Sequence, residues 1–429
     1  MIGPGILVAA TGVGAGDLAT ATFTGAKLGT AILWAVLFGA TLKFMLNEGL
    51  TRWQLATGTT ILEGSARYLG KASQRFFYLY LVVWSYLVAM ALMSACGVAA
   101  SALIPVFNEP AQGKIVFGIL QSLLAVLLVY FGGYKLFEKI MSVCIGLMFV
   151  VVVVTAVVLS PAPSDVVAGL MIPRIPELTN GGIGWTVALL GGVGGTVTVL
   201  CYGYWIQEEG REGSERLGDC RFDLMVGYGM TAVFGVAMVV IGSQLEGMES
   251  SGARLIVEIA EILESRMGDW GGILKWAFML GAWGAFFSSL LGVWQSVPYL
   301  FADFWRIQSS AVSSAAGKPA KAGTVSREER SAAMKTLSTS RLYRYHLLAI
   351  ALIPISGLFL FDFASAMKIN GVVGAFFIPI LATALILLNG NASRVGVTMV
   401  NGWPSRIGLA VALAVFVVAG VLKIWSAFG

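Results

Sequence analysis

The chain has 429 residues, of which 57% are apolar and only 12% are charged, and its net charge is +5. A soluble protein carries about 25% charged residues, so this composition excludes an ordinary soluble domain and indicates a membrane protein with many spans. A nucleic-acid binder would gather its basic residues on one soluble face, whereas here they lie mostly in loops between apolar runs. The four cysteines have no paired spacing and no metal-ligand pattern, so no disulfide framework is expected.

Apolar runs long enough to cross a bilayer recur along the chain. A helix needs about 20 residues to cross roughly 30 Å of hydrocarbon, and this length predicts eleven spans. They cover residues 2–29, 30–50, 76–103, 115–131, 136–159, 183–207, 224–245, 273–304, 342–360, 372–388 and 407–425. The N-terminus lacks a basic leader, so we interpret the first run as a span rather than a cleaved signal. The expected fold is an all-α membrane protein.

The loops between these spans differ in charge on the two sides of the membrane. The loops on the side of the N-terminus carry nineteen Lys and Arg residues, and the opposite loops carry five. Basic residues accumulate in short cytoplasmic loops. This asymmetry predicts a multi-pass protein of the plasma (inner) membrane with a cytoplasmic N-terminus and an external C-terminus.

Two loops have a character of their own. Residues Arg254–Met267 place apolar side chains at helical spacing with acids between them, which predicts a short amphipathic helix on the outer surface. Residues 309–340 are rich in Ser, Ala and Lys without apolar periodicity, which predicts a mobile cytoplasmic loop. Neither loop is expected to form a separate domain.

Glycine clusters interrupt the first and sixth predicted spans. Glycine costs about 1 kcal/mol per residue inside a helix, so each cluster favours unwinding. The clusters are Gly12, Gly14 and Gly16 in the first span and Gly191, Gly192, Gly194 and Gly195 in the sixth. Gly-interrupted spans in corresponding positions of two halves indicate a substrate site at the bilayer midplane of a transporter. The alternative is that these glycines only permit close helix packing.

Asp17 favours a cation site over simple packing. A carboxylate near the middle of a span is costly, and no Lys or Arg lies within the same glycine-rich stretch. We therefore expect Asp17 to attract a cation and to be its principal ligand. The alternative role is to cap the half-helix that begins at Leu18, because Asp is a preferred N-cap residue.

Carbonyl and hydroxyl oxygens at the two breaks are the other candidate ligands, because such groups can coordinate a hard cation. The predicted metal ligands are Asp17 and Thr198, and the predicted substrate-binding set adds Thr11, Gly14, Gly195, Cys201 and Asn370. For Cys201 a buried apolar role is the simpler interpretation.

Several short motifs, taken in order, resemble the Nramp family of divalent metal transporters, which have the LeuT-like inverted-repeat fold. The motifs are Gly25-Ala26-Lys27-Leu28-Gly29 with Leu33-Trp34, Arg52-Trp53-Gln54-Leu55-Ala56-Thr57-Gly58 with Leu62-Glu63, Lys135-Leu136-Phe137-Glu138, and Phe376-Phe377-Ile378-Pro379. The resemblance extends across most of the chain. It implies one transmembrane domain with a five-plus-five repeat at about 1–160 and 183–389, broken first and sixth helices, and an extra helix at 405–427.

The site departs from the family pattern. Where Nramp transporters have Asp-Pro-Gly-Asn in the first break, this chain has Gly14-Ala15-Gly16-Asp17, and their Met-Pro-His falls on Thr198-Val199-Leu200. A soft sulfur ligand helps a site to prefer Mn²⁺ or Fe²⁺ over hard cations, so its loss predicts a shift toward hard cations such as Mg²⁺. The third span has no acid and the only histidine is His346, distant from both breaks, which predicts weak or no proton coupling.

The sequence therefore predicts an Nramp-related secondary transporter that moves a divalent metal cation by alternating access. The expected partners are the metal ion and membrane lipid, without nucleic acid, and the expected state is a monomer. No nucleophile–base pattern or cofactor fingerprint occurs, so neither an enzyme nor a bound cofactor is expected. Two alternatives stay open: a transporter of a small organic solute such as an amino acid, and a non-transporting receptor.

Overall fold

The computed structural model describes residues 3–245, 253–314, 337 and 339–428, and the regular elements within these residues are all helices. Eight described segments are long and apolar enough to cross a membrane, and a shorter apolar helix covers Trp403–Val418. Two of the eight, Asp17–Thr57 and Pro110–Val158, each bend within their length and cover parts of two predicted spans. The prediction of an all-α membrane protein is confirmed.

The helices follow the predicted spans closely. In the first part they are α1 Pro4–Gly12, the π-helix η1 Val13–Ala21, α2 Thr22–Leu28, η2 Gly29–Ile32, α3 Leu33–Thr57, α4 Ile61–Tyr68, α5 Gly70–Leu103, α6 Pro110–Val158 and α7 Pro163–Met171. In the middle they are η3 Leu178–Gly182, α8 Ile183–Gly192, η4 Val197–Leu200, α9 Cys201–Glu208, η5 Ser214–Arg216, α10 Leu217–Ser243, α11 Ala253–Arg266, η6 Gly268–Trp270 and α12 Gly271–Ser314. The last are α14 Arg341–Leu352, α15 Ile355–Leu360, α16 Phe363–Ala375, α17 Phe377–Asn389, α18 Ala392–Val395 and α19 Trp403–Phe428.

The structure adds detail that the spans did not predict. The fourth and fifth spans form one helix, α6, with a sharp bend at Gly133, and the tenth span is divided at Phe376 between α16 and α17. The predicted amphipathic helix is present as α11. The predicted loop at 309–340 lies largely outside the described residues.

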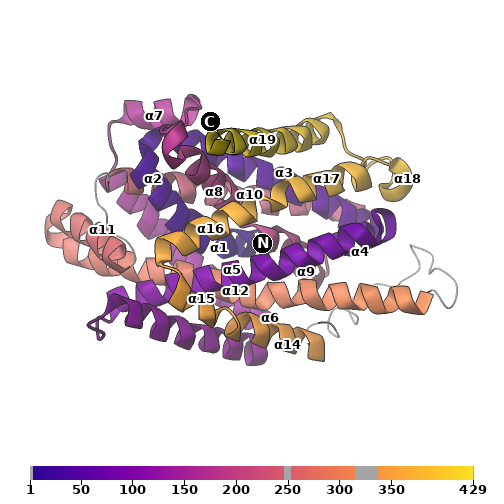
Figure 1. Ribbon diagram of the computed structural model, residues 1–429, viewed down its shortest axis with the longest axis horizontal. Helices are drawn as coiled ribbons and strands as arrows, with labels where there is room; N and C mark the ends of the chain where they lie inside the picture. Colours follow the sequence, from indigo (N-terminus) through magenta and orange to yellow (C-terminus); the bar gives the residue numbers. More distant parts are fainter. Residues whose placement is uncertain (1–2, 246–252, 315–336, 338, 429) are drawn as a thin grey trace.

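The glycine-interrupted segments lie at the centre of the bundle. Helix α1 and the π-helix η1 pack against α10 and α12, while α8 packs against α16 and α3. Helices α5, α6 and α12 run side by side along one flank, and α17 and α19 pack together on the opposite one (Figure 1). The outer helices therefore enclose the two segments predicted to form the site.

Gly133 bends α6 between the fourth and fifth predicted spans. A straight helix of 49 residues would be about 74 Å long, far more than the roughly 30 Å of hydrocarbon. The chain bends at Gly133, whose φ of 64° and ψ of 178° lie in a region open essentially only to glycine. This bend makes two spans from one continuous helix.

We expect Gly133→Ala to destabilise the protein by about 1–3 kcal/mol, because alanine is strained in this conformation. The matched control is Gly146→Ala in the same helix, where an added Cβ has open space and no positive φ. Thermal unfolding of both variants in detergent measures the difference. Equal melting temperatures for the two variants would show that the bend does not require glycine.

Candidate functional site

The sixth span is unwound between α8 and α9, as predicted. Helix α8 ends at Gly192, and the chain then passes through Val193 in an extended conformation. Gly194 and Gly195 have φ values of 70° and 83°, which favour glycine. The chain resumes a helical course only at η4, so the glycines supply the backbone freedom of the break.

The first span is interrupted in a different way from the one expected. The segment around Asp17 is not unwound but forms the π-helix η1, and the physical reason lies in α12. The Ser289 hydroxyl accepts a hydrogen bond from the Gly14 amide at 2.7 Å and donates one to the Ala10 carbonyl at 3.0 Å. In an α-helix the Gly14 amide would donate to the Ala10 carbonyl. The Ser289 hydroxyl instead lies between these two groups and replaces that hydrogen bond, which widens the helical turn.

The two interruptions touch each other through glycine backbone. A Cβ on Gly12 would lie 2.6 Å from the Gly195 nitrogen and 2.7 Å from the Gly194 carbonyl carbon. A Cβ on Gly191 would lie 2.5 Å from the Gly371 carbonyl oxygen of α16. Both glycines therefore permit close packing, which was the alternative interpretation of the clusters, and they also bring the breaks together around one cavity.

This cavity is small. Its volume is about 20 Å³, and its lining comes from α1, α5, the sixth-span break, α12 and α16. The lining residues are Thr11, Gly12, Val88, Leu92, Gly192, Gly195, Thr196, Thr198, Val293 and Asn370. A cavity of roughly 10–15 Å³ is enough for one water molecule, so this one accommodates a single water or a single ion.

Asn370 gives the cavity an unpartnered polar atom. Its side chain is 5% exposed, and its Oδ1 atom has no hydrogen-bond partner among the described residues. The Thr11 hydroxyl donates to the Leu7 carbonyl at 2.6 Å, so its oxygen remains able to accept or coordinate. Four of the predicted candidates, Thr11, Gly195, Thr198 and Asn370, thus meet at one place.

Asp17 does not line this cavity. It is fully buried and lies near the Gly194 amide and against α10, where a Cβ on Gly235 would be 3.4 Å from Oδ1. Neither carboxylate oxygen has a hydrogen-bond partner among the described residues, so Asp17 does not act as a helix cap. The geometry therefore separates Asp17 from the oxygens that it was expected to join.

A lysine from another helix, Lys43 of α3, lies near this carboxylate. Its ammonium group is fully buried and interacts electrostatically with Asp17, although the two are too far apart for a direct salt bridge. The sequence argument considered only the stretch of chain around Asp17, which holds no Lys or Arg, and so it did not consider Lys43. A Lys inside the second predicted span was the sequence signal that this reasoning missed.

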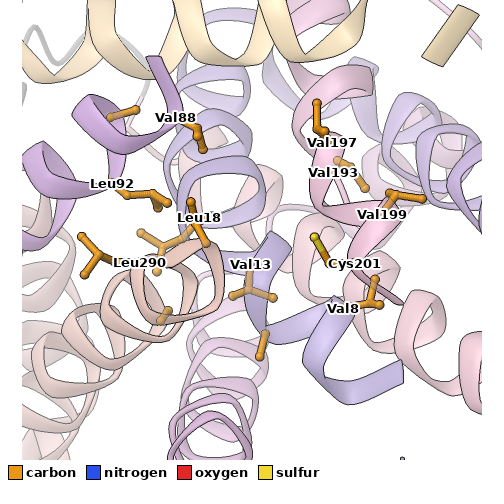
Figure 2. Packing of buried hydrophobic residues seen from close by; sticks show 14 of the residues in the cluster. Val8, Val13, Leu18, Val88, Leu92, Val193, Val197, Val199, Cys201 and Leu290 are labelled. Atoms are coloured by element: carbon orange, nitrogen blue, oxygen red, sulfur yellow. The ribbon is translucent and has the colours of Figure 1, made fainter. Parts of the chain in front are cut away.

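The remaining predicted residues lie outside the cavity. Gly14 packs against Ser289, and Cys201 lies in apolar packing near Val8, Val193 and Val199 (Figure 2). This placement fits the simpler interpretation of Cys201 as a buried apolar residue. Val88 and Leu92 line the cavity and were not predicted, since no local pattern places them there.

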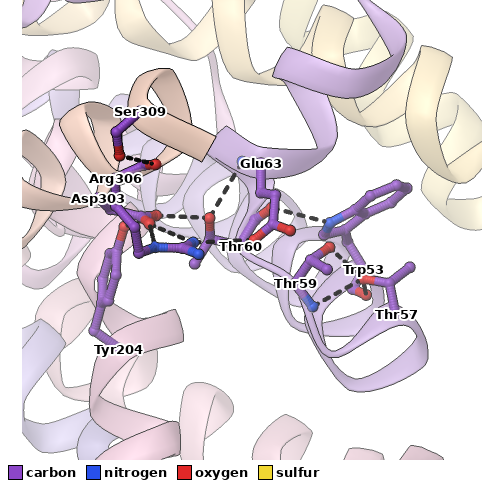
Figure 3. A network of polar contacts seen from close by, with 9 residues as sticks. All are labelled: Trp53, Thr57, Thr59, Thr60, Glu63, Tyr204, Asp303, Arg306 and Ser309. Carbon is purple, nitrogen blue, oxygen red and sulfur yellow. Dashed lines mark hydrogen bonds and ion pairs between the residues drawn. The ribbon is translucent and has the colours of Figure 1, made fainter. Parts of the chain in front are cut away.

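A polar network lies at the end of the molecule where α9 and α12 finish. The buried Asp303 carboxylate accepts hydrogen bonds from Tyr204 at 2.8 Å and from Thr60 at 2.7 Å (Figure 3). Arg306 pairs with Asp303 at 2.7 Å and with Glu63 at 3.0 Å. These bonds join α4, α9 and α12 on one side of the molecule.

A second carboxylate holds the start of α1 at the same end. Asp223 of α10 accepts hydrogen bonds from the Gly3 and Gly5 amides at 3.1 and 2.8 Å, and from Tyr202 at 3.1 Å. A carboxylate at a helix N-terminus satisfies free amides and opposes the positive end of the helix dipole. The half-helices α1 and α9 are therefore tied to α10.

Comparison with known proteins identifies the same architecture. The family model described as Natural resistance-associated macrophage protein-like (Nramp) matches residues 5–426. Among solved structures, a variant of the Eremococcus coleocola manganese transporter covers 98% of this chain and 85% of its own at 14% identity, with a TM-score of 0.65. MhsT in complex with L-phenylalanine covers 99% and 98% at 16% identity, with a TM-score of 0.63. These likenesses show the LeuT-like fold.

Relatives found by sequence match shorter parts of the chain. An uncharacterized protein of Pasteurella multocida is 24% identical over 278 residues, which are 63% of this chain and 63% of that protein. Metal transporter Nramp3 of Oryza sativa is 27% identical over 44% of this chain and 34% of its own length. The divalent metal cation transporter MntH of Staphylococcus aureus is 27% identical over 46% and 42%. The matched region spans less than two thirds of each of these relatives.

We expect Ser289→Ala to lower stability by about 1–3 kcal/mol, because the Gly14 amide and the Ala10 carbonyl lose their buried partner. The matched control is Ser288→Ala, whose hydroxyl bonds to Ala285 of its own helix at 3.0 Å and reaches Ala10 only at 3.4 Å. Thermal unfolding compares the two variants. A loss in Ser288→Ala as large as that in Ser289→Ala would argue against the inserted hydroxyl.

Proposed function

Because the chain belongs to the Nramp family, we propose that it carries a hard divalent metal cation, such as Mg²⁺ or Mn²⁺, across the plasma membrane by alternating access. The observation that carries the proposal is the small cavity, lined by buried residues, between the two interrupted helices, with the unpartnered Asn370 oxygen on its wall. Thr11, Thr198 and the Gly195 backbone complete an oxygen-rich set of candidate ligands.

The size of the cavity favours an ion over an organic solute. Sites for small organic ligands usually enclose about 300–1,000 Å³, whereas this cavity encloses about 20 Å³. An amino acid would need the walls to separate widely. A single ion that has shed most of its water needs no such change.

The chemistry of the lining supports a preference for hard cations. The candidate ligands are hydroxyl, amide and carbonyl oxygens, which suit Mg²⁺ and Mn²⁺. No group of three or more His, Cys, Asp or Glu side chains that could hold a metal occurs within the described residues. We therefore assign Asp17 an electrostatic role rather than direct ligation, and we keep Thr198 as a ligand.

The surroundings of the cavity also support weak or absent proton coupling. The third predicted span, now α5, presents Val88 and Leu92 to the cavity, and neither side chain can carry a proton. His346 lies on α14, where its ring stacks on Phe301 at 4.5 Å and Nδ1 lies 2.8 Å from the Leu342 carbonyl. The only imidazole of the chain thus has a packing role.

Alternating access requires one side to close while the other opens. The bonds around Asp303 and Asp223 tie the half-helices to their neighbours at one end, and we propose that this end faces the cytoplasm with the N-terminus. The C-terminus would then lie outside. We propose a monomer surrounded by lipid as the transporting unit.

Removing single oxygens tests the proposed site. We expect Thr198→Val and Asn370→Leu each to weaken Mg²⁺ or Mn²⁺ affinity about tenfold, which corresponds to about 1.4 kcal/mol. The readouts are the cation-dependent melting temperature and cation uptake into proteoliposomes. The matched control is Thr186→Val, because the Thr186 hydroxyl bonds to the Gly182 carbonyl of its own helix outside the cavity.

The same panel separates the alternatives. Stabilisation and uptake of an amino acid, with no response to metal ions, would replace the metal by an organic solute. Stabilisation by a metal ion without any uptake would favour the receptor. Unchanged metal affinity in both cavity variants would place the binding site elsewhere.

A second variant tests the preference for hard cations. We expect Thr198→Met to raise the affinity for soft Cd²⁺ relative to Mg²⁺, because it restores a thioether to the cavity. Thr198→Leu has a similar size and no sulfur, so it controls for the added bulk. Competition of Cd²⁺ with Mn²⁺ uptake measures the ratio, and an equal ratio in both variants would contradict the assignment of Thr198.

A further inference from the structure

The Lys43 side chain is bound by three backbone carbonyls at and just after the end of α8, and we call this group of carbonyls the cradle. The Lys43 Nζ atom donates hydrogen bonds to the Gly191 carbonyl at 2.9 Å, to the Val193 carbonyl at 3.1 Å, and to the Gly195 carbonyl. Gly191 lies in the last turn of α8, Val193 and Gly195 belong to the unwound segment that follows, and Lys43 comes from α3. The side chain is fully buried.

The hydrogen-bond count indicates a charged group. An ammonium group has three N–H donors and no acceptor, and here three carbonyls surround it. A neutral amine would have only two donors and would turn a lone pair toward one of these oxygens. An isolated buried charge is very costly, so these bonds and the carboxylate of Asp17 nearby must stabilise it.

The cradle has the features of a binding site for a monovalent cation. Carbonyls at the C-terminal end of a half-helix carry partial negative charge, and in transporters with discontinuous helices such carbonyls coordinate a coupling ion. The cradle adds a buried carboxylate, Asp17, that has no hydrogen-bond partner among the described residues. Three carbonyls and one negative charge make a suitable environment for one positive charge.

We propose that the Lys43 ammonium is a tethered cation that fills a monovalent-cation site of this protein, so that the second helix break needs no bound Na⁺ or K⁺. The side chain holds the carbonyls of Gly191, Val193 and Gly195 together and neutralises Asp17. It is a positioning residue, since it lies beside the cavity rather than in its lining. The inference goes beyond the proposed function and holds whichever solute is carried.

Replacing Lys43 by methionine, whose side chain ends in a methyl group instead of an ammonium group, tests this role. In Lys43→Met the site is vacated, and we expect NH₄⁺, K⁺ or Na⁺ to raise the melting temperature saturably, by roughly 2–5 °C relative to N-methylglucamine. The wild-type protein should show no such response. The matched control, Lys27→Met, removes an exposed lysine at the end of α2 and should also show none.

A double variant identifies the charge that attracts the added ion. Asp17→Asn combined with Lys43→Met removes the carboxylate as well, and we expect the half-saturating concentration of NH₄⁺ or K⁺ to rise at least about tenfold. A saturable response in Lys43→Met that this second change weakens supports the tethered cation. A flat response to all three ions in folded Lys43→Met overturns it.

Should Lys43→Met fail to fold, the wild-type protein decides the matter. Melting temperatures in N-methylglucamine, Na⁺ and K⁺ that coincide support a site already filled by Lys43. Saturable stabilisation of the wild-type protein by Na⁺ or K⁺ shows a separate ion and overturns the proposal. Neither result depends on metal uptake, so failure of this inference and failure of the transport proposal are distinguishable.

Discussion

Backbone groups that leave their helical partners inside a bilayer find no water, so each must be satisfied within the protein. This constraint governs the centre of the molecule. At the first interruption the Ser289 hydroxyl bridges Gly14 and Ala10, and at the second the Lys43 ammonium collects three carbonyls. Without these two side chains, both interruptions would leave polar backbone exposed to an apolar surrounding.

The same interactions divide the polar centre into two compartments. Asp17 and Lys43 are both fully buried and interact electrostatically beside the unwound segment. On the other side lies the small cavity with its uncharged oxygens. A site built from neutral dipoles binds a cation weakly enough to release it, and release is a requirement of transport as well as of conduction.

Much of the fold could be predicted from the sequence because apolar length and glycine clusters are local signals. The spans and the sixth break follow from them, and three residues of the predicted substrate-binding set, Thr11, Thr198 and Asn370, line one cavity. The form of the first interruption was not predictable, since Gly14 and Ser289 are 275 residues apart. The neighbour of Asp17 was missed for a similar reason: Lys43 meets carbonyls 148–152 residues away, and only the packing of α3 on α8 brings them together.

The central claim is that the cavity between the interrupted helices, rather than the Asp17 carboxylate, receives the metal ion. A crystal structure of the protein soaked with Mn²⁺, with the metal located by its anomalous scattering, tests this most directly. The account predicts a single peak inside the cavity, within coordination distance of the Asn370 Oδ1 atom. A peak on Asp17 with Lys43 displaced, or a metal bound only outside the bundle, would contradict it.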